Sequence, residues 1–422
     1  MGFNTGGGGG ISAATDVALN SPQDNQSLTY DNSSSKWVNE TVSGGGGGSG
    51  VAPATKVVAA NDAPTAVKAS ADYVCDGTAD EVQINQAIAA IASDTISLGS
   101  QGGTVLLWGE QFNTAGAILI RSQVTVKGLG QFSTIIRPVN SYRPGENGGV
   151  IELFSADTQY TTVTDLGIHG NGWGASDSDC CGIYYFQGAG TQYDAAHRII
   201  NMYIYATSRH GIRLRGGSGS RGRASYVSNI RIIEAGTAQH SDACGLWLDS
   251  HVDSFFFAID VGTSASHGFR INGANNRFVG CKGWFSGSLG SSNHDGSGFY
   301  VSGVRNQFVG CESQDNYGDG FFIGSPDNTL SGCVADSNGY NRNGGNGTGG
   351  WTGSGYYVNT SRMTLQGNAF DKTESGRPLY QKHAVEIGSG SLTGLIIQVA
   401  SGASGSTSLG GTAGGGNIVN VV

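Results

Sequence analysis

A repeated phrase between residues 267 and 333 constrains the fold of this chain more than any other feature. The segments HGFRINGANNRFVGC, SGFYVSGVRNQFVGC and DGFFIGSPDNTLSGC share one order: glycine, an apolar residue, a variable residue, a second apolar residue, turn residues, then Asn-x-apolar-x-Gly-Cys. Apolar residues at period two, bounded by Gly, Asn, Asp and Ser, predict a strand, a turn and a second strand. Repetition of such a unit predicts a solenoid of stacked coils.

The Gly-apolar-x-apolar part of the phrase sets the phase of the coils over a longer stretch. It begins at Gly182, Gly211, Gly245, Gly268, Gly298, Gly320 and Gly355, in steps of 29, 34, 23, 30, 22 and 35 residues. The shortest steps indicate the length of a bare coil, so the longer ones contain loops. We place these loops at residues 169–181, 218–223, 284–296 and 338–353. Over residues 104–400 this spacing predicts about ten coils.

Equivalent positions in successive coils form ladders, because stacked strands lie about 4.8 Å apart. One ladder is expected to hold buried thiols beside a turn: Cys281, Cys311 and Cys333. In-register stacking holds their Cβ atoms too far apart for a relaxed disulfide. A second ladder is expected to hold amides that hydrogen-bond from coil to coil: Asn276, Asn306 and Asn328.

Composition excludes several classes of protein. Glycine accounts for 72 of 422 residues without a strict triplet, which excludes collagen, and a hydrophobic content of 38% is too high for general disorder. Charged residues make up only 13%, with a net charge of −9, which argues against nucleic acid as the main partner. Such a surface suits neutral or polar ligands such as glycans.

The first residues, MGFNTGGGGGIS, contain neither a basic nor an apolar signal-peptide region, so we expect no export signal. No apolar run is long enough to cross a bilayer, and no membrane insertion is expected. The seven cysteines lack zinc-type spacing, and we expect reduced thiols, no metal and no cofactor.

Residues 71–136 contain a second informative pattern. ADYVCDGTADEVQINQAIAAIASD, then GGTVLL, then VTVKGLGQFSTII resembles the start of the pectate-lyase superfamily. The resemblance implies an all-β fold: a right-handed parallel β-helix over residues 70–400 whose N-terminal end is covered by a helix. Thr78 and Glu81 have capping-box spacing, so the helix is expected to start there.

Residues 16–39, DVALNSPQDNQSLTYDNSSSKWVN, resemble a module common near the N-termini of bacteriophage tail fibre and minor tail proteins. The resemblance implies that residues 1–42 attach the chain to other tail proteins and that the chain is a homotrimer. It also implies a location in the virion tail after synthesis in the host cytoplasm. Residues 43–69 are expected to be a Gly-rich linker and extended lead-in, and residues 401–422 a Gly-rich tail.

The variable residue of each phrase is expected to point outward, because side chains alternate across a strand. These residues form a stripe: Tyr184, Arg213, Trp247, Arg270, Tyr300, Phe322 and Tyr357. Arg213, Trp247 and Arg270 are expected to stack as alternating cations and π faces. The stripe is either a glycan groove, with Tyr184, Arg213, Trp247, Arg270 and Tyr300 as substrate-binding residues, or a trimer seam or loop-covered packing surface.

Catalytic residues are harder to place. Glycoside hydrolysis needs two carboxylates at a defined separation, and Glu234, Asp242 and Asp249 are the candidates. The motifs of polygalacturonases, which belong to the same superfamily, are missing. The resemblance to phage tail proteins implies a tail fibre, tailspike or minor tail protein that contacts the host surface, and the missing motifs favour binding of an envelope polysaccharide over its cleavage. The alternatives are a polysaccharide depolymerase, either glycosidase or lyase, and a purely structural tail component.

Overall fold

The structure is a computed structural model. It describes residues 15–19, 26–31, 34–41, 55–92, 102–172, 178–188, 195–217, 222–236, 240–289, 294–339, 353–372, 381–389, 391–401, 407–410 and 416–422. The central parts of all four predicted loops and the Gly-rich linker lie outside these residues. The chain divides into two compact units, residues 1–52 and 53–422.

The N-terminal unit is a small sheet of β1 (Val17–Ala18), β2 (Gln26–Asp31) and β3 (Lys36–Thr41), in the order β1-β3-β2. β3 pairs in parallel with β1 and antiparallel with β2. Tyr30 and Trp37 lie opposite each other on β2 and β3, with ring centroids 5.4 Å apart, and both are largely exposed.

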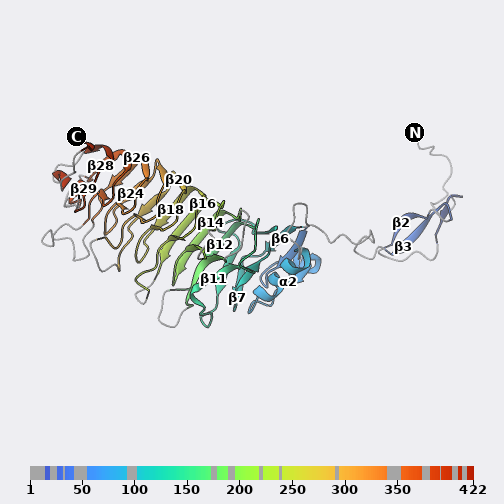
Figure 1. Ribbon diagram of the computed structural model, residues 1–422. Helices are drawn as coiled ribbons and strands as arrows, with labels where there is room; N and C mark the ends of the chain where they lie inside the picture. The colour runs from blue at the N-terminus through green and yellow to red at the C-terminus, as the bar shows by residue number, and fades with distance from the viewer. Residues whose placement is uncertain are drawn as a thin grey trace. The chain divides into compact units, whose positions relative to one another are not determined.

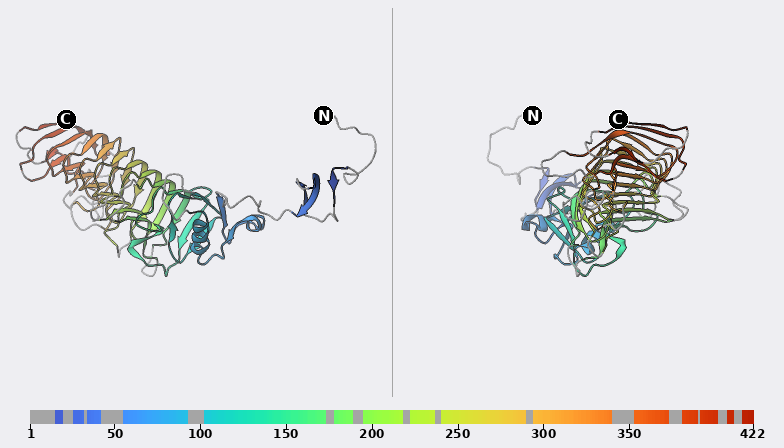
Figure 2. Two further views of the ribbon diagram at one scale, coloured as in Figure 1. Left: turned by 45° about the vertical axis from the view of Figure 1, so that its right-hand side comes forward. Right: turned by 90° about the vertical axis from the view of Figure 1, so that its left-hand side faces the viewer.

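The second unit is a right-handed parallel β-helix, in which the strands follow one another in chain order from β6 to β28 (Figure 1). Figure 2 shows the stacked coils from two other directions. The strands form two sheets, and within each sheet every described strand pairing is parallel. The long sheet contains 18 described strands: β4 (Thr55–Ala59), β5 (Tyr73–Val74), β6 (Gly103–Trp108), β7 (Gln111–Thr114), β9 (Val124–Lys127), β10 (Ile135–Pro138), β12 (Thr162–His169), β14 (Arg198–Thr207), β16 (Tyr226–Ala235), β18 (Phe255–Gly262), β20 (Arg277–Val279), β21 (Lys282–Trp284), β23 (Gln307–Val309), β24 (Glu312–Gln314), β26 (Thr329–Asp336), β28 (Met363–Phe370), β30 (Leu395–Ser401) and β32 (Ile418–Val421).

The short sheet contributes one strand to each coil. Its 11 described strands are β8 (Ile118–Ile120), β11 (Gly145–Leu153), β13 (Cys180–Gln187), β15 (Ile212–Gly216), β17 (Leu246–Asp249), β19 (Phe269–Ile271), β22 (Phe299–Val301), β25 (Phe321–Ile323), β27 (Tyr356–Val358), β29 (His383–Ile387) and β31 (Thr407–Gly410). Ten of them lie within residues 104–400, in agreement with the predicted number of coils.

The interior is filled by the two apolar residues of each phrase, and the predicted phase is confirmed. In every phrase both apolar side chains are fully or almost fully buried, as in Phe299 and Val301. Aromatic rings stack from coil to coil: Phe269 on Phe299 at 4.4 Å, and Phe299 on Phe321 at 4.8 Å. Each such side chain removed from water contributes about 1.5–3 kcal/mol to folding.

Left-handed residues form the corners of the coils. The same corner begins with a left-handed residue in three successive coils: Asn275, Arg305 and Asp327, with φ angles of 58°, 57° and 63°. Gly280 and Gly310 bend the long sheet between β20 and β21 and between β23 and β24, with φ angles of 60° and 59°. A glycine adopts this conformation without the penalty that a Cβ atom brings.

The two predicted ladders are confirmed. The backbone N–H of Asn276 donates to Oδ1 of Asn306 at 3.0 Å, and the N–H of Asn306 donates to Oδ1 of Asn328 at 2.8 Å. The thiols of Cys281, Cys311 and Cys333 are fully buried, and each lies 3.6 Å from a backbone carbonyl oxygen of the preceding coil. All seven cysteines of the chain are unpaired and buried.

In the part of the chain that the structure describes, two helices precede the regular coils: α1 (Thr65–Ser70) and α2 (Glu81–Ile91). α2 lies at the N-terminal end of the coils (Figure 1) and buries Ile84, Ile88 and Ile91 in the core of the β-helix. The predicted capping box is wrong. The Thr78 hydroxyl donates to Asp76 at 2.7 Å, and the Glu81 carboxylate accepts the backbone N–H of Ala115 at 2.9 Å, so both side chains bind partners outside the helix.

The segments on either side of the predicted β-helix take part in its sheets. β4, within the stretch expected to be an extended lead-in, pairs with β6. β31 and β32, within the Gly-rich tail, pair with β29 and β30. Among the described residues, no helix is both long and apolar enough to span a membrane.

Candidate functional site on the short sheet

The predicted stripe is one continuous ladder on the outer face of the short sheet. Strand pairing places its members directly opposite one another, in the order Tyr184, Arg213, Trp247, Arg270, Tyr300, Phe322 and Tyr357. We call this row the short-sheet ladder.

The side chains of the short-sheet ladder stack on each other as predicted. The Trp247 ring lies between two guanidinium groups, with Arg213 3.9 Å and Arg270 4.5 Å from it. Further along, Tyr300 and Phe322 stack at 4.6 Å with an angle of 2° between their planes. Each cation–π contact contributes about 0.5–2 kcal/mol, so the ladder holds its own side chains in fixed orientations.

One end of the ladder is covered by the chain itself. Tyr184 and Arg213 are only 7% and 3% exposed. Arg213 Nη1 donates to the carbonyl oxygen of Glu146 at 3.0 Å, and Nη2 donates to Asp249 at 2.9 Å. At Arg213 this agrees with the packing alternative for the stripe, because Glu146 of β11, 67 residues earlier in the chain, contacts its guanidinium group.

The middle of the ladder is open and lines a hollow of about 220 Å³. Its walls come from Ser241, Asp242, Ser266, His267, Arg270, Leu289, Asp295 and Tyr300. Arg270 and Tyr300, which are half-buried, belong to the ladder, whereas the other residues precede strands β17, β19 and β22. The hollow therefore brings two carboxylates, an arginine and a tyrosine together.

The polar groups beside the hollow are partly unpaired within the described residues. Nδ1 of His267 and Nε of Arg270 are buried, and neither has a hydrogen-bond partner there. The Tyr300 ring lies on the His267 imidazole at a centroid distance of 4.5 Å. Burial lowers the pKa of His267 to about 3, so its ring is neutral at pH 7. A buried unpaired polar atom costs about 1–3 kcal/mol.

The three carboxylates predicted from the sequence do not come together. Asp242 lies in the hollow before β17, whereas Asp249 ends β17 and forms ion pairs with Arg213 and Arg215 at 2.9 and 3.4 Å. Glu234 is near the end of β16 in the long sheet. The structure thus leaves Asp242 as the one sequence-predicted carboxylate that lines the hollow.

Sequence reasoning missed Asp295, although the repeat contains a signal for it. Asp242 and Asp295 each stand three residues before the glycine of their phrase, Gly245 and Gly298. In the coil between them this position is the buried Ala265. Two coil steps separate the two carboxylates by about 10 Å along the axis.

A second polar cluster lies beside the far end of the ladder. His294 contacts the rings of Phe322 and Tyr357, and its Nδ1 is 2.7 Å from Oδ2 of the fully buried Asp319. The hydrogen bond with Asp319 raises the pKa of His294. The other carboxylate oxygen of Asp319 accepts the N–H of Ser354 at 2.8 Å. Both oxygens of Asp319 are thus occupied within the chain, which indicates a structural role.

The fold and the hollow define the class of structure: a parallel β-helix with a polar, aromatic-edged hollow on its outer face. The sequence matches no known family description and no curated protein.

Solved structures do match. ORF18 of Geobacillus virus E2 is 17% identical, with a TM-score of 0.53 over 78% of this chain and 60% of that one. The full-length tailspike protein 2 from Escherichia coli O157:H7 bacteriophage CAB120 is 14% identical, with a TM-score of 0.56 over 77% of this chain and 40% of that one. The A-module of a mannuronan C-5 epimerase from Azotobacter vinelandii is 14% identical, with a TM-score of 0.53 over 82% of this chain and 97% of that one.

These similarities establish the right-handed parallel β-helix, which the sequence predicts. The chain covers less than two thirds of the two viral structures, so their full-length proteins contain substantial parts that have no counterpart in the alignment.

Proposed function

We propose that this chain is a bacteriophage tail protein, of the tail fibre, tailspike or minor tail type, that binds an envelope polysaccharide of the host. The observation that carries the proposal is the hollow on the short sheet, where the open part of the short-sheet ladder meets Asp242 and Asp295. Arginine and carboxylate groups bind the hydroxyl groups of a sugar, and Tyr300 borders the same hollow. The N-terminal phrase at residues 16–39 and the similarity to a tailspike support a location in the virion tail.

The affinity of the wild type and of an Arg270→Ala variant for a polysaccharide tests this proposal. The purified protein is applied to an array of bacterial envelope polysaccharides, and its affinity for a retained polysaccharide is then measured by titration. Arg270→Ala removes a guanidinium group from the hollow, and we expect a loss of about 2 kcal/mol, or about 30-fold in affinity. Arg277→Ala is the matched control, because Arg277 also lies over an aromatic ring, that of Phe255, but on the long sheet. Equal affinities of the Arg270→Ala variant and the wild type would contradict the proposal, and no retention by the wild type would favour the purely structural alternative.

A depolymerase is the second candidate, favoured by the two carboxylates in one hollow. Glycosidases that invert configuration hold their carboxylates about 6.5–9.5 Å apart, close to the axial separation of Asp242 and Asp295. If the protein cleaves the polysaccharide, Asp242→Asn and Asp295→Asn should each slow the release of reducing ends about 100-fold or more. Asp249→Asn, which changes a carboxylate outside the hollow, is the control. Release that persists in both hollow variants would refute this candidate, and unsaturated uronate in the product would indicate a lyase.

We also infer a homotrimer that attaches to other tail proteins through residues 1–42. The long sheet has exposed apolar side chains on its outer face, and Val279 and Val309 pair directly there. Such surface is what a second copy would cover. Light scattering should give about three times the chain mass of 43.3 kDa, whereas a monomer mass would contradict the inference.

A further inference from the structure

A second and larger hollow lies at the N-terminal end of the long sheet. It measures about 880 Å³ and is lined by Asn61, Asp62, Gly77, Glu110, Gln111, Asn113, Phe132, Ser133, Ile135, Arg137 and His169. None of these residues lines the hollow on the short sheet. We call it the long-sheet groove. Its volume lies within the range of about 300–1,000 Å³ that is usual for binding sites of small ligands.

One wall of the long-sheet groove is an exposed aromatic platform. The Phe132 side chain is 67% exposed, which is unusual for a large apolar residue. Its ring packs against Tyr203 at 5.0 Å, and Tyr203 stacks on Tyr205 at 6.0 Å with an interplanar angle of 13°. The phenyl ring is thus supported from behind and presents a fixed apolar surface to the groove.

Another part of the lining is a chain of oriented amides. Gln111 Nε2 donates to Asn113 Oδ1 at 2.8 Å, and Asn113 Nδ2 donates to the carbonyl oxygen of Gly77 at 2.9 Å. Beneath them the Asp62 carboxylate accepts the backbone N–H groups of Glu110 and Gln111 at 3.0 and 2.9 Å. These bonds fix the polar groups before a ligand arrives, which lowers the entropic cost of binding.

The charges in the long-sheet groove do not favour an acidic ligand. Arg137 is its one cationic side chain among the described residues, and Arg137 donates from Nη2 to Oδ1 of Asn171 at 3.0 Å. Asp62 and Glu110 supply two negative charges. Burial, followed by the nearby Arg137, lowers the pKa of His169 below its ordinary value, so its ring is neutral at pH 7. The formal charge of the groove is therefore negative.

We propose that the long-sheet groove is a second glycan-binding site, which holds an uncharged segment of an oligosaccharide with one sugar ring on Phe132. The hydroxyl or acetamido groups of the sugar hydrogen-bond to Gln111, Asn113 and Arg137. The inference shares with the proposed function the assumption of a glycan ligand, but it concerns a different face of the β-helix. A chain with two separated sites gains avidity for a long polysaccharide, because the second contact becomes intramolecular.

The test compares two kinds of probe on the full-length protein. Tetra- to hexasaccharide fragments of bacterial envelope polysaccharides, one set uncharged and one set containing uronic acids, are titrated against the wild type and variants. Phe132→Ala should weaken the binding of uncharged fragments at least 10-fold, whereas Phe132→Tyr, which keeps the ring, should retain it. Phe154→Ala is the matched control, because Phe154 is 49% exposed, stacks with Arg121 and lies outside the groove.

Three outcomes would overturn the proposal: equal affinity of Phe132→Ala and the wild type for uncharged fragments, binding of uronic acid fragments alone, or a change of oligomeric mass in Phe132→Ala. The last outcome would show that Phe132 is a contact between copies of the chain. The two sites fail independently, because Arg270→Ala tests the short-sheet hollow and Phe132→Ala tests the long-sheet groove.

Discussion

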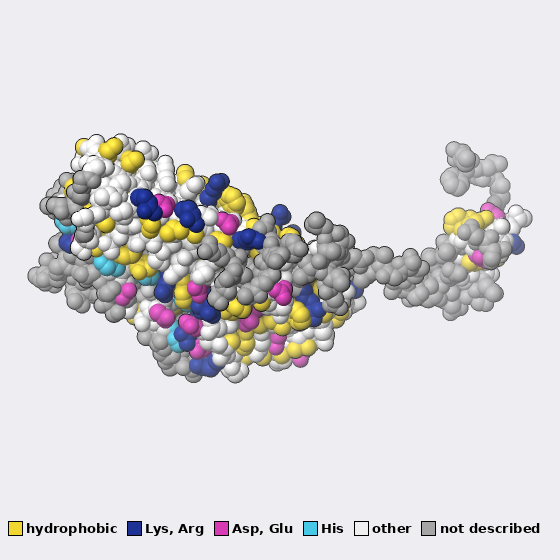
Figure 3. Space-filling model, viewed as in Figure 1, with side chains coloured by type: hydrophobic (Ala, Val, Ile, Leu, Met, Phe, Trp, Pro, Cys, Tyr) yellow, Lys and Arg dark blue, Asp and Glu magenta, His cyan; other side chains and the backbone are white. Residues whose placement is uncertain are grey.

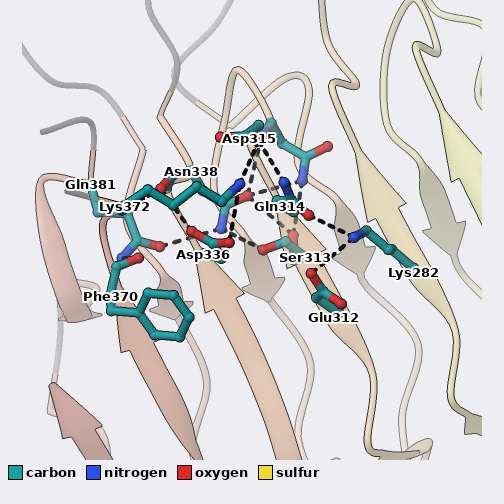
Figure 4. A network of polar contacts seen from close by, with 12 residues as sticks. Lys282, Glu312, Ser313, Gln314, Asp315, Asp336, Asn338, Phe370, Lys372 and Gln381 are labelled. Atoms are coloured by element: carbon teal, nitrogen blue, oxygen red, sulfur yellow. Dashed lines mark hydrogen bonds and ion pairs between the residues drawn. The ribbon is translucent and has the colours of Figure 1, made fainter. Parts of the chain in front are cut away.

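At the scale of the residue, Lys372 shows how the β-helix neutralises charges that it buries (Figure 4). Its ammonium group lies 3.0 Å from Oδ2 of Asp315 and 3.2 Å from Oδ2 of Asp336. Both carboxylates are almost fully buried, at 1% and 6% exposure. An unpaired buried carboxylate is costly. Lys372, which follows β28, therefore stabilises the carboxylates at the ends of β24 and β26 and joins three successive coils.

Lys372→Met should therefore lower the free energy of unfolding by about 3–5 kcal/mol, because it removes the ammonium group that lies between two buried carboxylates. Lys282→Met is the control: Lys282 binds Glu312 at 3.0 Å, but both side chains are more than one-third exposed, so the expected loss is below about 1 kcal/mol. Denaturant titration measures both values. Similar losses in the two variants would show that the burial around Lys372 has no energetic effect.

His294 makes stability depend on pH. Its pKa is raised in the folded state by the hydrogen bond with Asp319, so protonation of His294 stabilises the fold. This contribution is fully present below the unfolded pKa of about 6.5 and is lost as the pH rises through the folded pKa. The denaturant midpoint of the wild type should fall as the pH rises above about 6.5. In His294→Gln this fall should disappear, and its persistence would assign the effect to another group.

The sequence predicted the direction of a side chain correctly where that direction depends only on the strand that carries the residue. The alternation of side chains fixed Ile183 as buried and Arg270 as outward, because it depends only on local backbone geometry. It missed the cover over Arg213, because that cover comes from Glu146, 67 residues earlier in the chain. It also assigned Thr78 to a capping box. The Thr78 hydroxyl instead donates to the nearby carboxylate of Asp76, and the spacing of Thr78 and Glu81 does not reveal this competing acceptor.

At the scale of the element, the Asn ladder closes the corner before the long sheet. Asn306 is fully buried; its Oδ1 accepts the N–H of Asn276, and its Nδ2 donates to the carbonyl oxygen of Gly273, both at 3.0 Å. One side chain thus satisfies two backbone groups of the preceding coil. The spacing of the repeat predicted this ladder, since each asparagine stands at the same place in its phrase.

Asn306→Ala should destabilise the protein, because each of the two backbone groups left unpaired costs about 1–3 kcal/mol. Gln307→Ala is the matched control: it removes the neighbouring exposed amide and should change stability by less than about 0.5 kcal/mol. Denaturant midpoints provide the comparison. Equal midpoints for the two variants would mean that the ladder is not needed to hold the corner.

At the scale of the whole molecule, the sequence predicted the scaffold much better than the site. The repeat specified a β-helix because in-register stacking requires the same residue types at the same phase in each coil. The short-sheet hollow draws its lining from three successive coils, and Asp242 and Asp295 belong to the two outer ones. The long-sheet groove joins residues 61–77, 110–113, 132–137 and 169, which contain no repeat. Features of this kind depend on differences between coils, which a repeat pattern does not report.

The most direct test of the proposed function is a crystal structure of the protein with an envelope tetrasaccharide that it retains in solution. We expect a sugar in the short-sheet hollow, in contact with Tyr300 and within hydrogen-bond distance of Arg270, Asp242 or Asp295. A bound sugar found only on other surfaces, with this hollow free of ligand, would contradict the assignment of the short-sheet ladder as the primary glycan site.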